Sequence, residues 1–555
     1  MAKDRVANAK REKYKKISAS IILLAIISNA AYYAFTHFEG PSAYGDDPNY
    51  LYLASSFVKG NYVMNPGYIF SVRIMQFLPI AFFYKIFGVT NLTSTLWDIL
   101  SYIGIIITTF FLVKFFYNGY KAALISSFIV SIFPVVAKFA VNTGEDPPLT
   151  FISILAVLLL LYAEKTNKKA YFFSSGVLLV VDWLIGYEAG IIIGFILIYL
   201  LIELIRKKIT INYNSIFFVY GIIIAFLLTF IFSFYTSNPP NPFITITRNI
   251  NFYSAVGTKV NGQPTIPTSN TKLNFYPDQF FQEHLFEILT QSNNIGQNLQ
   301  NAYNTLFSLS PDNFGITYYY LIFSLIAIFA LRDRRAYFII FWYAFMTLFL
   351  EFGPMHVGIS FHPFSINYLL SHRLGRFMMI TTPAISAIIG IAMSKLLEFK
   401  NKYLLVLGAA FAAFLLIVLY FNSYASIMYF YYWQYYQESL VLPAANFLRY
   451  NNTVNHNALI YLEAYWHNTT VTYTGANFNS YYGDPSSSKI IFTITNTTNC
   501  SEFLNGSYVV WSGPPHCNNW ISVYEMPQVK GIPESIINAE RPNLVYIPTN
   551  IYLVK

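Results

Sequence analysis

Long apolar windows with almost no charge constrain this chain more than any other feature. Each window can cross the roughly 30 Å hydrocarbon core of a bilayer as a helix. Because 55% of the 555 residues are hydrophobic and only 11% are charged, the chain is a membrane protein and not a soluble one. The first window, Ile17 to Phe38, is too long for a signal peptide and lacks its cleavage site, so we expect a retained anchor.

We therefore expect an α-helical polytopic membrane protein with about eleven spans. Their approximate ranges are 17–38, 94–116, 120–140, 148–164, 170–187, 189–206, 214–234, 316–332, 337–352, 376–396 and 402–422. The transmembrane domain would cover residues 17–422. An odd number of spans puts the two ends of the chain on opposite sides of the membrane.

The distribution of charge predicts which side is which. Residues 1–16 are basic and should stay in the cytoplasm, and alternate connections repeat this bias, at Lys165, Lys168 and Lys169, Arg206 to Lys208, Arg332 to Arg335, and Lys395 to Lys402. The opposite connections hold the Asn-x-Ser/Thr acceptor sequons, at Asn91, Asn451, Asn468, Asn496, Asn499 and Asn505. The net charge of +9 is therefore a topology signal, and we expect no nucleic acid partner.

The segment GYIFSVRIMQFLPIAFFYKIFG, residues 67–88, allows two interpretations. As a span it would invert everything that follows and place Asn91 and the acidic loop at 144–148 inside. We prefer a helix that lies at the outer interface within external loop 1, about residues 39–93, with its basic side chains snorkelling to water.

Two more external regions follow from this topology. A long polar loop, about residues 236–314, exceeds a simple connector and should be a folded or substrate-covering element. The tail, residues 423–555, contains alternating stretches such as ALIYLEAY, TVTYTG, KIIFTIT and SYVVWSG, which predict a small extracytoplasmic domain of mostly β structure. The chain's two cysteines, Cys500 and Cys517, lie in this tail, where we favour a disulfide over two free thiols.

Acidic residues recur where the predicted spans meet the external face. They are Asp46 and Asp47 after the first span, Glu145 and Asp146 in NTGEDPPL, and Asp182 and Glu188 around the hairpin DWLIGYEAG. A carboxylate beside apolar surface needs a partner or a role, so we expect these acids to line one cavity. A structural alternative stays open for Asp146, which precedes two prolines as a helix N-cap would.

Basic residues on the same face suggest an anionic substrate. His372, Arg373 and Arg376 come just before the tenth span, where the positive-inside bias disfavours arginine. The planar guanidinium binds two phosphate oxygens at once, although snorkelling to lipid headgroups is the alternative. Lys138 and Arg248 are weaker candidates for the same anion, and Asp98 and Lys114 are interpreted as structural, at the bundle surface or paired.

The order of these features resembles the GT-C superfamily of polyprenyl-phosphate-sugar-dependent glycosyltransferases, especially its protein mannosyltransferase and aminoarabinose transferase branch. The family pattern has an acidic pair in the first external loop, an interfacial helix ending in Phe-Gly before span two, an acidic position where span four starts, and a later arginine followed by proline. Here these are GDDPNYLYLASSFVKGNY, IFGVTNLTSTLWDIL, NTGEDPPL and GRFMMITTPAISAIIGIA. The resemblance covers about residues 17–420.

The resemblance implies roles for particular residues. Asp46 or Asp47 would be the catalytic carboxylate, Glu145 with Asp146 the second acid, and Arg376 a ligand of the donor phosphate. The WWDYG-type motif of oligosaccharyltransferases is absent, so transfer of a whole glycan to asparagine is not expected. Where the family often has a lysine after the hairpin, Tyr187 and Glu188 stand instead.

These residue types suit sugar transfer. Breaking a sugar-phosphate bond needs a base for the acceptor hydroxyl and positive charge at the departing phosphate. The base would be Asp46 or Asp47 and the clamp Arg373 with Arg376, while Asp47 and Asp146 are candidate ligands for Mg²⁺ or Mn²⁺. We expect a glycosyltransferase that uses a polyprenyl-phosphate sugar and a protein, lipid or glycan acceptor at the outer face of the cell membrane. The alternatives are a flippase for a lipid-linked sugar, and an inactive scaffold.

Overall fold

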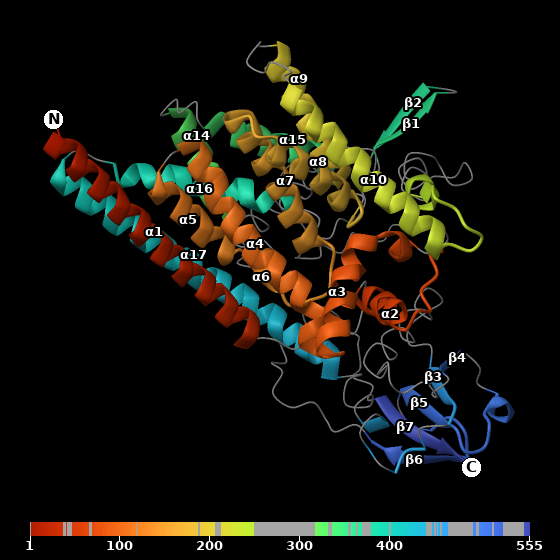
Figure 1. Cartoon of the computed structure of the whole chain (residues 1–555). Coiled ribbons are helices and arrows are strands. Elements are labelled where there is room, and N and C mark those ends of the chain that lie inside the picture. The colour runs from red at the N-terminus through yellow and green to blue at the C-terminus, as the bar shows by residue number, and fades with distance from the viewer. Residues whose placement is uncertain are drawn as a thin grey trace.

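The computed structural model describes residues 2–36, 40–41, 47–65, 69–117, 119–186, 189–205, 213–248, 317–330, 336–352, 357–361, 364–368, 379–398, 401–439, 447–448, 451, 453–455, 458–463, 492–495, 499–512, 515–525 and 549–555. Helices form a bundle, and a small sheet lies at one end of it (Figure 1).

Every window predicted to cross the membrane contains a helix. The helices are α1 (Ala2–Thr36), α4 (Asn91–Tyr117), α5 (Tyr120–Ser131), α6 (Pro134–Phe139), α7 (Asp146–Thr166), α8 (Lys169–Trp183), α9 (Ala189–Ile205), α10 (Ile216–Thr236), α14 (Thr317–Ala330), α15 (Tyr337–Phe352), α16 (Thr382–Leu396) and α17 (Lys402–Ser439). Within the described ranges, 6 helices are long and apolar enough to cross a membrane alone, and shorter apolar helices accompany them. The N-terminus and the C-terminal sheet lie at opposite ends of the bundle (Figure 1).

The window at 120–140, predicted as one helix, is broken. After α5 ends at Ser131, Phe133 is extended (φ −67°, ψ 120°) and Pro134 begins the short α6. Proline disfavours helical backbone in the residue before it and has no N–H for the preceding turn, so it can start a helix but not continue one. The break lets the chain turn before it reaches the acidic loop that follows.

Burial separates central helices from peripheral ones. In the most apolar window of each helix, 78% of the residues are buried in α7 and 83% in α16, whereas only 17% are buried in α10 and in α17. The outward faces of α10 and α17 carry exposed large apolar side chains such as Leu228 and Phe414, which suit contact with lipid. The central helices, including α4 and α5, supply most of the main hydrophobic core.

The crossing of α8 and α10 depends on two glycines. A Cβ on Gly176 would lie 2.1 Å from the carbonyl oxygen of Phe218, and one on Gly221 would lie 2.2 Å from that of Phe173. Because those neighbours are backbone atoms, neither can move aside cheaply. The pair therefore allows the close approach that small residues give helices in membranes.

The segment predicted as the first external loop contains two helices, α2 (Asp47–Val58) and α3 (Ile74–Phe87). Thr143 contacts the chain on both sides of α3: its N–H donates to Asp47 Oδ2 (2.8 Å) and its hydroxyl donates to the Ser94 carbonyl oxygen (3.1 Å). Since Asp47 and Ser94 meet the same residue, the segment between them begins and ends at the same end of the bundle. This agrees with a helix outside the spans, while its place at the outer interface stays a prediction.

Two further contacts join this segment to the ends of α8 and α10. The Met75 N–H donates to the Leu184 carbonyl oxygen (3.1 Å) just after α8, and the Met64 N–H donates to the Thr236 carbonyl oxygen (2.8 Å) at the end of α10. The start of α4, the start of α7 and the ends of α8 and α10 therefore surround α2 and α3 at one end of the bundle.

The C-terminal region contains the predicted β structure. Its five-stranded sheet has the order β4-β3-β5-β7-β6, from β3 (Ile460–Glu463), β4 (Phe492–Thr495), β5 (Tyr508–Ser512), β6 (Trp520–Tyr524) and β7 (Thr549–Val554). β3 is parallel to β4 and β5, and β7 is antiparallel to β5 and β6. Cys500 and Cys517 form a disulfide beside this sheet, with their Cα atoms 5.6 Å apart.

A β-hairpin precedes α16, although the sequence pattern indicated no strands there. β1 (Val357–Phe361) pairs antiparallel with β2 (Phe364–Tyr368). Most of the long loop predicted at 236–314 and the stretch TVTYTG lie outside the described residues.

Candidate active site

The loop from Ala140 to Glu145 connects α6 to α7 and carries the second predicted acidic pair. Asp146 is the first residue of α7, and Pro147 and Pro148 follow it in the first turn, where proline needs no N–H partner. The negative charge of Asp146 is favourable there because the N-terminus of a helix is electropositive. Glu145 and Asp146 are both buried.

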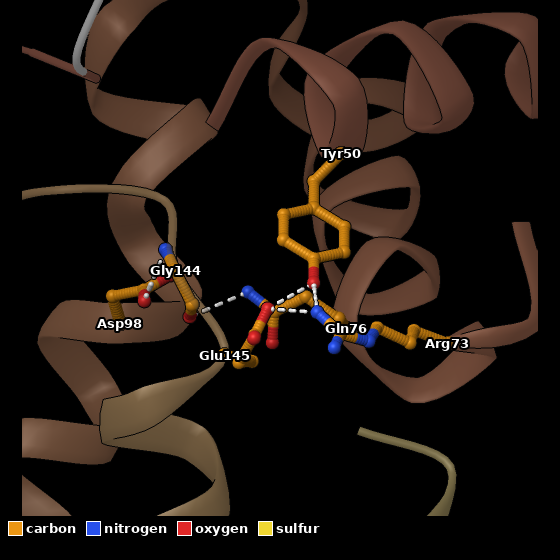
Figure 2. Close-up of polar contacts among 6 residues, drawn as sticks. All are labelled: Tyr50, Arg73, Gln76, Asp98, Gly144 and Glu145. Carbon is orange, nitrogen blue, oxygen red and sulfur yellow. Dashed lines mark hydrogen bonds and ion pairs between the residues drawn. The ribbon is translucent and has the colours of Figure 1, made fainter. Parts of the chain in front are cut away.

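Glu145 is paired with two residues of the segment that contains α2 and α3 (Figure 2). Its Oε2 lies 2.5 Å from Nη1 of Arg73, and both side chains are buried. The Tyr50 hydroxyl donates to the same carboxylate oxygen and accepts from Arg73 Nη1 at 2.6 Å. The triad joins α2, the start of α3 and the acidic loop. It holds one carboxylate in a fixed direction and compensates its charge.

The backbone at Thr143 and Gly144 is held by side chains from three helices. Thr143 N–H donates to Asp47, as described above. Gly144 N–H donates to Asp98 Oδ1 of α4 (3.1 Å), and Gly144 O accepts from Gln76 Nε2 of α3 (2.7 Å). Figure 2 shows Asp98 and Gln76 on opposite sides of Gly144. Both side chains are fully buried.

Three carboxylates crowd around this backbone. The charge of Asp98 interacts repulsively with those of Asp47 and Asp146. Asp98 Oδ2 is buried and makes no hydrogen bond to the part of the chain that the structure describes. Three carboxylates beside one buried loop repel each other unless their charges are compensated.

Packing around Tyr62 supports the segment that leads to Arg73. Its hydroxyl donates to the Ser71 carbonyl oxygen (2.6 Å), and its ring packs against Phe77 and Phe232. Burial raises the pKa of Tyr62 above its usual value, so the phenol keeps the proton that this bond uses. The turn before Arg73 is therefore fixed to α3 and α10.

The structure brings some of the predicted site residues together and places others elsewhere. Asp47, Glu145 and Asp146 meet at one end of the bundle. Asp182 is fully buried near the end of α8 and accepts a hydrogen bond from Ser153 of α7 (2.5 Å). Lys138 lies in α6 with its ammonium group 4.9 Å from the centroid of the Phe139 ring. Outside the described residues lie Asp46, Glu188, His372, Arg373 and Arg376.

Four residues of the cluster escaped the sequence analysis or were misinterpreted there: Tyr50, Arg73, Gln76 and Asp98. Arg73 was expected to snorkel to water, but it is buried against Glu145. Asp98 was expected to be structural, at the bundle surface or paired; it is fully buried and accepts from the Gly144 N–H, so only the surface alternative is wrong. A signal for Arg73 existed, because the predicted topology makes it an external arginine against the positive-inside bias. Tyr50 and Gln76 carry no charge and gave no such signal.

The donor set can be tested against the expected divalent ion. No group of three His, Cys, Asp or Glu side chains gathers as a metal site within the described ranges. Asp47 and Asp146 would therefore supply two carboxylate ligands, with the remaining ligands coming from substrate phosphate and water. Mg²⁺ is commonly held in this way.

Comparison with known proteins agrees with this architecture. Residues 72–234 match the sequence model of the dolichyl-phosphate-mannose-protein mannosyltransferase family. The fold is similar to that of ArnT from Cupriavidus metallidurans, with a TM-score of 0.52 and 11% identity over 96% of this chain and 98% of that one for the apo state. The likeness to the same protein bound to undecaprenyl phosphate has a TM-score of 0.52 at 12% identity, over 95% of this chain and 97% of that one.

The oligosaccharyltransferase of Archaeoglobus fulgidus is more distant in structure. Its TM-score is 0.49 at 12% identity, over 86% of this chain, and this chain spans 65% of that protein. No curated protein sequence matches the chain. The family match covers Asp98, Glu145 and Asp146 of the acid cluster, and the fold is similar to that of ArnT, so both comparisons agree with the resemblance to the GT-C superfamily of membrane glycosyltransferases.

Proposed function

We propose that this protein moves a sugar from a polyprenyl-phosphate carrier to an acceptor on the outer face of the membrane. The observation that supports this most is the buried cluster of Asp47, Asp98, Glu145 and Asp146 at one end of the helix bundle. The cluster lies mainly in the segment that matches the mannosyltransferase family, and the similar ArnT fold is described in a complex with undecaprenyl phosphate. The donor would keep its prenyl chain in lipid and its phosphate at the membrane boundary.

The reaction needs one proton transfer and one exchange of bonds at the sugar. A carboxylate of the first external loop, Asp46 or Asp47, takes the proton of the acceptor hydroxyl. The acceptor oxygen then forms a bond to the anomeric carbon while the bond from that carbon to the phosphate oxygen breaks. The polyprenyl phosphate leaves with the bonding electron pair. Arg373 and Arg376 would stabilise its growing negative charge, as arginine forks do for phosphate.

Glu145 and Asp146 have a supporting part in this proposal. Because Glu145 is compensated by Arg73 and Tyr50, it serves to fix the site and not as a second base. Asp146, together with Asp47, would hold Mg²⁺ or Mn²⁺, which when bound would neutralise charge on the donor phosphate.

The test is an assay of purified protein in liposomes with a set of radiolabelled polyprenyl-phosphate sugars and candidate acceptors. We expect release of polyprenyl phosphate and transfer of label to acceptor. Asp46→Asn or Asp47→Asn should lower the rate by at least about 10²-fold, the size typical of a lost general base. The matched control is Glu398→Gln, an exposed carboxylate beside Lys395 that is remote from the site in sequence.

Distinct outcomes separate the alternatives. Full activity in both aspartate variants would refute the assignment of the base. Movement of the lipid-linked sugar across the membrane without transfer of label would identify a flippase.

Adding EDTA to the same assay tests the metal: we expect loss of activity that Mg²⁺ or Mn²⁺ restores.

A further inference from the structure

We propose that Asp98 and Gln76 are positioning residues that clamp Gly144, and that this clamp sets the geometry of the catalytic acids. The inference rests on the proposed transferase function. Asp98 Oδ1 accepts from the Gly144 N–H (3.1 Å), and Gln76 Nε2 donates to the Gly144 carbonyl oxygen (2.7 Å). Figure 2 shows the two side chains meeting Gly144 from different helices.

The clamp holds a backbone that has no helix of its own. Gly144 lies between α6, which ends at Phe139, and α7, which begins at Asp146. Its surroundings are buried, so its N–H and carbonyl need partners from the protein. Two fully buried side chains supply both bonds, and they come from α3 and α4. The positions of α3 and α4 therefore determine the position of the loop.

Each acid of the site depends on this position. On one side of Gly144, the Thr143 N–H holds Asp47 Oδ2. On the other side, Glu145 reaches Arg73 and Tyr50, and Asp146 starts α7. A shift of Gly144 would move the base and the supporting acids together. A misplacement of about 1 Å can cost on the order of 10²-fold in rate, since catalytic groups act only within narrow limits of geometry.

The role assigned to Asp98 is geometric and not one of charge. Its carboxylate repels those of Asp47 and Asp146, and its second oxygen makes no hydrogen bond to the described residues. Asparagine at this position keeps an oxygen that accepts from Gly144 and removes the repulsion. Its amide N–H groups can also donate to the neighbouring carboxylates. Alanine removes the acceptor, so Asp98→Asn and Asp98→Ala separate the two roles.

The experiment measures kcat and KM for the full-length Asp98→Asn, Asp98→Ala and Gln76→Leu variants with the donor on which the wild type is active. The control is Ser175→Ala, which loses a buried hydrogen bond to the Ala156 carbonyl oxygen (2.8 Å) between α7 and α8. We expect kcat to fall by about 10²-fold in Asp98→Ala and Gln76→Leu, with KM little changed. Asp98→Asn should stay within a few-fold of the wild type and keep its pH profile of kcat.

Each result contradicts a different part of the proposal. Wild-type kcat in folded Asp98→Ala overturns the clamp. Asp98→Asn as inactive as Asp98→Ala, or with a shifted pH profile, overturns the geometric role in favour of charge. If Asp98→Ala does not fold, Gln76→Leu and Asp98→Asn decide, and an active Gln76→Leu contradicts the proposal. An inactive wild type would instead count against the proposed function.

Discussion

Arg73 and Glu145 show how burial changes the meaning of a charged residue. Their charged atoms lie 2.5 Å apart, and neither side chain reaches solvent to a large extent. A buried ion pair contributes little net stability by itself. Either charge left alone in the same place would strongly destabilise the fold, so the two are retained together. In this site the pair also directs the Glu145 carboxylate towards Tyr50.

Removing one member of this pair should therefore cost more than removing both. We expect Arg73→Met to lower the free energy of unfolding by roughly 3 kcal/mol, since it strands Glu145 in a buried place. The double variant Arg73→Met with Glu145→Met should recover most of that loss. Denaturant unfolding in detergent measures the change in the free energy of unfolding. The control is Lys395→Met, which breaks the exposed ion pair with Glu398. A cost for Arg73→Met no larger than that of the control would contradict the argument.

The site was predictable only where its residues are charged and lie at span ends. Asp47, Glu145 and Asp146 met that condition. Tyr50 did not, because it is neutral and its partner Glu145 stands 95 positions away. Asp98 was misjudged because its partner is a backbone N–H, which leaves no mark in a sequence pattern. The catalytic roles of the acids and of Arg373 and Arg376 stay predictions.

At the scale of single elements, helix identity followed from apolar length, while breaks and crossings did not. Pro134 was visible in the sequence, yet the apolar residues around it supported one continuous span. The structure ends the first helix at Ser131 because proline acts on the residue before it. The α8–α10 crossing depends on Gly176 and Gly221, and which glycines meet cannot be read from either helix alone.

Gly176→Ala should weaken the α8–α10 crossing. A Cβ there would meet the backbone oxygen of Phe218 at 2.1 Å, so the helices would have to separate. We expect a loss of about 1–3 kcal/mol of stability, as for other overpacked sites, visible as a lower melting temperature in detergent. Gly194→Ala is the matched control, since its Cβ would lie 3.7 Å from Phe345. Equal melting temperatures for the two variants would count against this account.

At the scale of the whole molecule, the helical architecture was the most predictable property. Apolar windows gave the order of the helices. The contacts of Thr143 place Asp47 and Ser94 at the same end of the bundle. The orientation that the basic connections and sequons indicate stays a prediction. The parallel strands of the small domain were not predictable in order, because β3 pairs with strands far from it in sequence.

The predicted orientation can be tested on sealed vesicles of known sidedness. Both native cysteines are in the disulfide, so a single added thiol reports its own side. We expect a membrane-impermeant maleimide to label Glu525→Cys, in the C-terminal domain, from outside. Glu12→Cys, near the basic N-terminus, should be labelled only after the vesicles are opened. The reverse pattern would overturn the orientation and place the acid cluster on the cytoplasmic side.

The last helix of the bundle does not stop where the bilayer does. α17 is continuous over 38 residues, or about 57 Å at 1.5 Å per residue, whereas the hydrocarbon core is about 30 Å thick. Roughly half of its length therefore exceeds the thickness of the hydrocarbon core. Under the proposed function, the part of α17 that extends beyond the core would stand beside the space that an acceptor enters.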